Sequence, residues 1–162
     1  MRNRKITTVG LVLVLSLASM SFKCNSNTEP NSNTTNPLRS AARAADAIAK
    51  SISEMNTVKR DLAHQGKITA AEELKLTQQL LRLNTADKTL VNRLKSMNST
   101  PDAAGQTQLL SMFNELTAAL DDLNSTGVLS VGNEDARNRL TVIITAIRSS
   151  LVIIQSFASS HG

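Results

Sequence analysis

The sequence predicts an all-α fold, an antiparallel up-down four-helix bundle, and three observations support this. Four stretches between residues 38 and 160 have apolar residues at alternating steps of three and four, a spacing that places them along one face of a helix. Short connections with capping and turn residues separate these stretches, as in up-down bundles. No convincing strand is visible. We expect helices over residues 38–64, 69–98, 101–124 and 133–159.

The first helix is predicted to begin just after Asn36 and to end near Gly66. Asn36 marks a boundary because the residue before a proline is disfavoured in the helical region. Lys59 falls where a strict heptad would place an apolar residue. Gly66 can adopt the left-handed conformation that ends a helix. The apolar stripe of this helix consists of Leu38, Ala41, Ala45, Ile48, Ile52 and Met55.

The second helix has the clearest start signal. Thr69 and Glu72 have the spacing of a capping box, in which the hydroxyl and the carboxylate each accept a hydrogen bond from a free backbone N–H. Asp87 interrupts the apolar stripe of this helix. Because an unpaired buried carboxylate is costly, we expect a small rotation of the helix that puts Ala86 in the core and Asp87 at its rim.

The third helix is predicted to start at Pro101, because proline at the first helical position and the nearby acidic Asp102 both favour a helix start. Residues 124–132 (NSTGVLSVG) contain two glycines and predict a loop. We expect the apolar residues of this loop to fold back over the end of the bundle, namely Val128, Leu129 and Val131.

The fourth helix is predicted to be capped by Asn133 and is unusually apolar. A helix of this kind is either central in its bundle or covered by a partner. If a partner covers the helix, the residues that widen its apolar arc are candidates for an interaction face. That face would bind a protein partner or a second copy. These candidates are Val142, Ile144, Val152, Ile153 and Phe157.

Residues 1–23 have the organisation of a signal peptide or membrane anchor. Three basic residues, Arg2, Arg4 and Lys5, precede an apolar run over residues 6–22, and a polar tract follows. Residues 24–37 are rich in Asn, Ser and Thr, and we expect a disordered spacer there. Four of the 18 basic residues precede Cys24, so removal of this segment would leave 14 basic against 13 acidic residues.

A cysteine just beyond an apolar segment, here Cys24, resembles the precursor of a bacterial lipoprotein. The resemblance covers residues 1–36. It implies that Cys24 becomes the first mature residue and carries the lipid, which attaches the protein to a membrane of the bacterial cell envelope. Ser21, Phe22 and Lys23 depart from the residues that this class prefers before the cysteine. Two alternatives therefore stay open: cleavage after Ser21, giving a soluble secreted or periplasmic protein, and an uncleaved inner-membrane anchor over residues 6–22.

The composition argues against several classes of partner. Basic residues alternate with acidic ones along the predicted helices, and Phe113 and Phe157 are the only aromatic residues after the signal segment. Nucleic-acid sites use basic patches together with stacking aromatic rings, so we expect no nucleic-acid partner. Cys24 is the only cysteine, which excludes an intrachain disulfide.

No recognisable catalytic or metal-binding pattern is present. The only histidines are His64 and His161, and Asp61 with His64 gives one pair one helical turn apart. Di-iron bundles need two such pairs and further carboxylates. The serines and threonines lack a neighbouring base in a recognised arrangement. We therefore expect no enzyme, cofactor or metal, and we assign His64 to complementing the dipole at a helix C-terminus.

The predicted function is a non-enzymatic exported helical bundle, tethered to a membrane through its N-terminal segment or lipid, that acts in protein interaction or envelope structure. A first alternative is a carrier that holds a small apolar ligand between the helices. A second is a membrane-active protein that uses residues 6–22 together with the fourth helix. Arg148 near the middle of that helix weighs against the second alternative, because a central arginine is costly in a bilayer.

Overall fold

The computed structural model describes residues 36–97 and 102–159. The predictions for the signal segment, Cys24, most of the spacer, Pro101 and His161 lie outside the described residues. The described residues contain four α-helices: α1 (Pro37–His64), α2 (Ala70–Ser96), α3 (Ala103–Asp122) and α4 (Glu134–Ser159).

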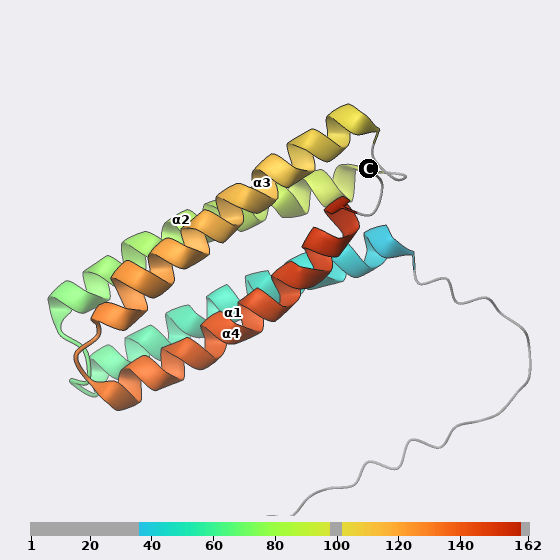
Figure 1. The fold of residues 1–162 in the computed structure, drawn as a ribbon. Helices are drawn as coiled ribbons and strands as arrows, with labels where there is room; N and C mark the ends of the chain where they lie inside the picture. Colours follow the sequence, from blue (N-terminus) through green and yellow to red (C-terminus); the bar gives the residue numbers. More distant parts are fainter. Residues whose placement is uncertain (1–35, 98–101, 160–162) are drawn as a thin grey trace, which may run out of the picture. The chain divides into compact units, whose positions relative to one another are not determined.

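The four helices run alternately up and down (Figure 1). α1 packs against both α2 and α4, whereas α3 packs against α2 and, less closely, against α4. No strand occurs in residues 36–97 and 102–159. The predicted all-α, antiparallel four-helix bundle is therefore confirmed.

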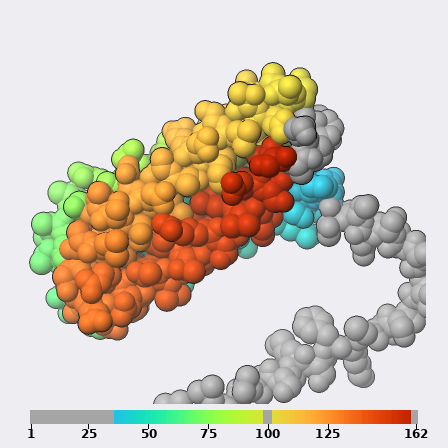
Figure 2. Space-filling view, in the orientation of Figure 1, coloured from blue at the N-terminus to red at the C-terminus, as the bar shows by residue number. Residues whose placement is uncertain are grey.

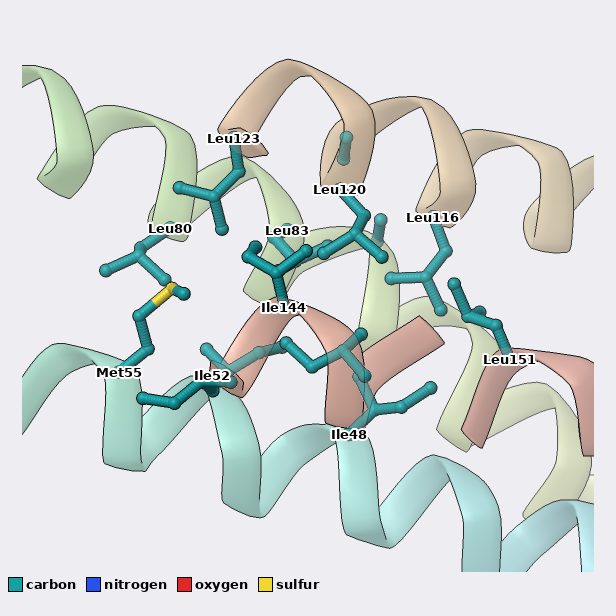
Figure 3. Close-up of a cluster of buried hydrophobic side chains, with 14 of the residues drawn as sticks. Ile48, Ile52, Met55, Leu80, Leu83, Leu116, Leu120, Leu123, Ile144 and Leu151 are labelled. Carbon is teal, nitrogen blue, oxygen red and sulfur yellow. The ribbon is translucent and has the colours of Figure 1, made fainter. Parts of the chain in front are cut away.

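An aliphatic core fills the space between the helices. Figure 3 shows Ile48 of α1, Leu83 of α2, Leu120 of α3 and Ile144 of α4 converging on one cluster. Burying one such side chain contributes roughly 1.5–3 kcal/mol relative to leaving it in water, so this cluster supplies the main stabilising term of the fold.

The turn between α1 and α2 forms as predicted. Gly66 has a positive φ of 67°, and the N–H of Lys67 reaches back to the carbonyl of Leu62 at 2.9 Å. This is the hydrogen bond that closes a helix C-terminus with a left-handed glycine. The predicted capping box is also present, since the Thr69 hydroxyl accepts from the N–H of Glu72 while the Glu72 carboxylate accepts from the N–H of Thr69.

The start of α3 differs from its prediction. The helix begins at Ala103, two residues later than expected, and Asp102 is its N-cap. The Asp102 carboxylate accepts a hydrogen bond from the N–H of Gly105 at 2.8 Å. Asp is among the preferred N-cap residues because its side chain satisfies a backbone donor that has no partner within the helix. The prediction for α4 holds, since the Asn133 side chain accepts from the N–H of Ala136 at 2.9 Å.

The connection between α3 and α4 is mostly helical, which corrects the predicted loop over residues 124–132. A π-helical turn, Leu123–Gly127, is followed by a 3₁₀ turn, Val128–Ser130. Val128 and Val131 are buried over the end of the core as expected, but Leu129 is exposed. Within this segment the hydroxyls of Ser125 and Thr126 donate back to carbonyls four residues earlier, a contact that often accompanies bent helices.

Side-chain bonds join this connection to the other turn at the same end of the bundle. The Glu72 carboxylate accepts from the N–H of Gly132 at 2.7 Å, and Lys67 forms an ion pair with Asp135 at the start of α4. The Lys67 ammonium lowers the pKa of the Asp135 carboxyl through a hydrogen bond and direct charge attraction. Polar groups therefore close this end, while apolar packing holds the length of the bundle together.

Candidate functional site

Asp87 lies in the core, which corrects the prediction that it sits at the rim. Its exposed fraction is 1%, and Ala86 beside it is also buried, at 4%. Rotation of α2 therefore does not move the carboxyl into water. The apolar residues on the same stripe of the helix, which include Leu83 and Leu90, are fully buried and carry Asp87 inward with them.

Few polar contacts offset the cost of burying the Asp87 carboxyl. One of its oxygens, Oδ1, is buried and has no hydrogen-bond partner. Burial, and to a lesser extent the negative charge of Asp46 on α1, raises the pKa of Asp87 to about 6. Asp46 itself lies 3.8 Å from the ammonium of Lys95 in an exposed ion pair. The group thus changes its charge in the mildly acidic range, inside the bundle.

Lys59 is the second charged residue in the core, with an exposed fraction of 5%. Its ammonium donates a hydrogen bond of 2.6 Å to the Thr77 hydroxyl, which in turn donates to the carbonyl of Glu73 at 2.7 Å. The sequence signalled this position, because Lys59 interrupts the heptad of α1. The charge that acts on Asp87 is that of Asp46, whereas Lys59 donates to Thr77.

The histidine of the described chain lies where the sequence predicts. His64 is in the last turn of α1 and is exposed, as is Asp61 one turn earlier. Among residues 36–97 and 102–159, no group of three or more His, Cys, Asp or Glu side chains is placed to hold a metal ion.

The five interaction-face candidates on α4 do not share one surface. Ile144 and Phe157 are buried, at 3% and 4% exposed, so these two are core residues and their assignment to an interaction face is corrected. Figure 3 shows Ile144 pointing into the shared core. Val142, Val152 and Ile153 are exposed at 70%, 63% and 47%. For Ile144 the physical reason is angular, because two steps of 100° turn it to the side of α4 opposite Val142. Phe157 lies within about 40° of Ile153 around the helix, so the angle alone does not account for its burial.

The outer face of α4 is almost free of charge. Between Leu140 and Ser159 the only charged residue is Arg148. Its guanidinium pairs with the carboxylate of Asp121 on α3 at 2.9 Å, which holds it at the side of α4 that borders α3. Figure 2 shows the surface of α4, orange to red, along the near face of the bundle beside α3. By contrast, α1 exposes charged residues at Arg43, Asp46 and Lys50.

Shallow grooves lie along the seams between helices. The groove between α3 and α4 has a volume of about 250 Å³ and is bordered by Phe113, Arg148 and Val152. Grooves of about 330 and 360 Å³ lie between α1 and α2 and between α2 and α3, and both are bordered by Leu81. Leu81 and Leu74 are exposed at 65% and 60%, and sequence analysis missed them. The available signal was that the two leucines are seven residues apart and off the core stripe of α2.

α4 is also the one helix of the described residues that is long and apolar enough to cross a membrane by length and composition. The central helix of a water-soluble bundle passes the same test. In this bundle α4 packs against α1 and α3 and contributes buried side chains along its whole length.

Comparison of the chain with protein-family models, with curated proteins and with solved structures found no match.

Proposed function

We propose that this protein is a non-enzymatic helical bundle, exported and held at a bacterial membrane by its N-terminal segment or by lipid on Cys24, and that it acts by binding protein through the outer face of α4. The observation that carries the proposal is the surface of α4 itself. Val142, Val152 and Ile153 are exposed on a stretch of twenty residues, Leu140–Ser159, that has Arg148 as its only charge.

Such a surface is unusual for a helix that only faces water. A surface helix of a globular protein normally presents charged and polar residues opposite its core stripe. Single exposed apolar residues need no explanation, but a contact surface on α4 would account for three of them on a stretch with Arg148 as its only charge. The N-terminal resemblance supplies the location, because a lipid on Cys24 and a polar spacer would keep the bundle close to a membrane.

The tether is tested by the intact mass of the protein in the membrane and soluble fractions of a bacterial host. An acylated species that starts at Cys24, found in the membrane fraction, supports it. An unmodified species that starts near Phe22, found in the soluble fraction, contradicts it. Substitution Cys24→Ser should move the protein out of the membrane fraction if lipid is the anchor.

The contact surface is tested by placing a photo-cross-linking amino acid at Val142 in the full chain in the same host. We expect one or a few discrete protein adducts. The matched control is the same amino acid at Leu81 of α2, which is exposed to a similar extent at 65%. Adduct patterns that are identical at both positions, or absent at Val142, would contradict binding through α4.

A further inference from the structure

The groove between α1 and α2 combines an apolar floor with polar walls. Its volume is about 330 Å³. Ile52 and Leu80 are buried beneath it, and Leu81 borders it with 65% of its surface exposed. An apolar surface with a few polar groups is the usual composition of a small-molecule site. The polar groups here are the hydroxyl and amide side chains of Ser53, Asn56, Thr77 and Asn84.

Lys59 stands at one end of this groove. It follows Ile52 and Asn56 on α1 at steps of four and three residues, which keeps the three on one face of the helix. Its ammonium donates to the Thr77 hydroxyl at 2.6 Å, and Thr77 borders the groove. Only 5% of the surface of Lys59 is exposed. The groove therefore ends at a buried positive charge.

The Lys59 ammonium has donors to spare. A lysine ammonium has three N–H donors, and among the described residues its acceptor is the Thr77 hydroxyl. It forms no ion pair with a carboxylate in residues 36–97 and 102–159. Buried charges in proteins are normally paired with an opposite charge. An anionic group that enters the groove at this end would gain a charge-assisted hydrogen bond from Lys59.

Packing does not account for a lysine at this position. Lys59 lies on the core stripe of α1 between Met55 and Leu62, both of which are fully buried. An apolar side chain would continue that stripe, and replacing buried ions by apolar residues is often neutral or stabilising. The charge therefore needs an explanation other than the stability of the bundle.

The opposite end of the groove is acidic. One helical turn beyond it lie Asp46 on α1 and Asp87 on α2. The exposed ion pair of Asp46 with Lys95, at 3.8 Å, offsets part of this negative charge. An anionic group is thus attracted to the Lys59 end and repelled from the other end, which gives a bound molecule one direction along the groove.

We propose that this groove binds an aliphatic carboxylate of medium length, with the carboxylate at the Lys59 ammonium and the chain along Leu80 and Leu81. The stretch of α2 from Thr77 to Asn84 spans about 10 Å, which suits a chain such as that of decanoate. A singly charged head group matches one ammonium, whereas a phosphate monoester carries about two charges. The site lies on α1 and α2 and goes beyond the protein contact proposed for α4.

The site is tested by photoaffinity labelling of the full chain in the fraction of a bacterial host that contains it. The probe is a decanoate analogue with a diazirine in its chain, and mass spectrometry locates the label. We expect it on peptides that contain Ile52 or Leu81, and we expect unlabelled decanoate to suppress it. Acetate has the head group without the chain, and decyltrimethylammonium has the chain with a positive head group. Neither should suppress the label at the same concentration.

Lys59→Met gives the decisive comparison. It exchanges the ammonium for an apolar side chain of similar length, so the bundle should stay folded, which circular dichroism verifies. Labelling of the groove should fall by about tenfold, because a hydrogen bond to a charged group is lost. Lys50→Met is the matched control, since it removes the same charge from an exposed position of α1 and should leave labelling unchanged. The competitor series tests the same point on the unsubstituted chain.

Each other outcome counts against the site. Full labelling of folded Lys59→Met, or equal suppression by decyltrimethylammonium, would overturn the role of Lys59. Equal suppression by acetate would show an adventitious ion only. Label confined to α4, or none above background, would exclude the groove as a binding site. These readouts are independent of the protein adducts at Val142, so failure here leaves protein binding by α4 intact.

Discussion

The carboxylate of Glu72 accepts a hydrogen bond of 2.7 Å from the backbone N–H of Gly132, sixty residues further along the chain. The same carboxylate accepts a bond of 2.7 Å from the N–H of Thr69 at the start of α2. One side chain therefore caps a helix and fixes the connection that leads into α4. These two backbone donors lower the pKa of Glu72, the Thr69 N–H having the larger effect.

Replacing Glu72 with alanine should destabilise the bundle by about 1–2 kcal/mol, because it removes a capping interaction and leaves the N–H of Gly132 without its acceptor. Thermal or urea unfolding of the full chain measures this. Glu73→Ala is the matched control, because it removes the same charge from the same helical turn. The hydrogen bond of Glu73 to the Thr77 hydroxyl uses its backbone carbonyl, which the substitution keeps. If Glu73→Ala lowers the stability as much as Glu72→Ala does, the hydrogen bonds of Glu72 are not the cause of the loss.

The contribution of Glu72 should also depend on pH. Its pKa in the folded state is lower than the ordinary value of 4.5, so its stabilisation is fully present above pH 4.5 and is lost as the pH falls through the folded-state pKa. The difference in unfolding free energy between the native chain and Glu72→Ala should therefore shrink on acidification below pH 4.5. A difference that stays constant down to pH 3 would contradict this reading, as would one that grows.

Local signals explain which parts of the fold were predictable. Gly66 and the capping box of Thr69 and Glu72 act within one helical turn. The sequence alone therefore predicts where α1 ends and where α2 begins. The connection after α3 depends on distant contacts. Gly127 sits where a Cβ atom would lie 3.2 Å from the Leu76 side chain on α2, which no local pattern could reveal.

The candidate site was predictable only in part, for a similar reason. The apolar excess of α4 is visible in the sequence, but its division into core and surface depends on how the helix is rotated in the bundle. That rotation buries Ile144 and exposes Val142, which lie on opposite sides of the helix. The cost of a buried carboxylate predicts a rim position for Asp87, but the burial of Leu83 and Leu90 on the same stripe fixes the orientation of α2 and outweighs that cost.

Asp87 should make the bundle less stable at neutral pH than at mildly acidic pH. Its pKa rises from 3.8 to about 6 on folding, so the folded state binds a proton more tightly, and stability falls as the pH rises from about 4 to about 6. The shift corresponds to at most about 3 kcal/mol. Asp87→Asn should remove this dependence and stabilise the chain at pH 7.5. Urea unfolding of both proteins at pH 4, 5, 6 and 7.5 measures it, and a slope that persists in Asp87→Asn would contradict this role.

Lys59 and Thr77 should respond to substitution in opposite directions. Lys59→Met replaces a buried ammonium by an apolar side chain of similar length and should be neutral or stabilising, by up to about 1–2 kcal/mol. Thr77→Val leaves that ammonium without its acceptor and should destabilise by about 1–3 kcal/mol. In the double variant the loss from Thr77→Val should largely disappear, because no buried ammonium remains. Additive effects of the two substitutions would contradict their coupling.

Because α4 has a core side and an outer side, truncating two side chains only two residues apart should lower the free energy of unfolding by unequal amounts. Ile144→Ala should destabilise the bundle by about 2–4 kcal/mol, because it removes buried methyl groups and leaves a cavity among the core side chains. Val142→Ala should change stability by no more than about 0.5 kcal/mol, since Val142 is 70% exposed. Equilibrium unfolding in urea compares the two variants with the native chain. If Val142→Ala costs as much as Ile144→Ala, α4 is rotated differently from this structure, and Val142 does not face outward.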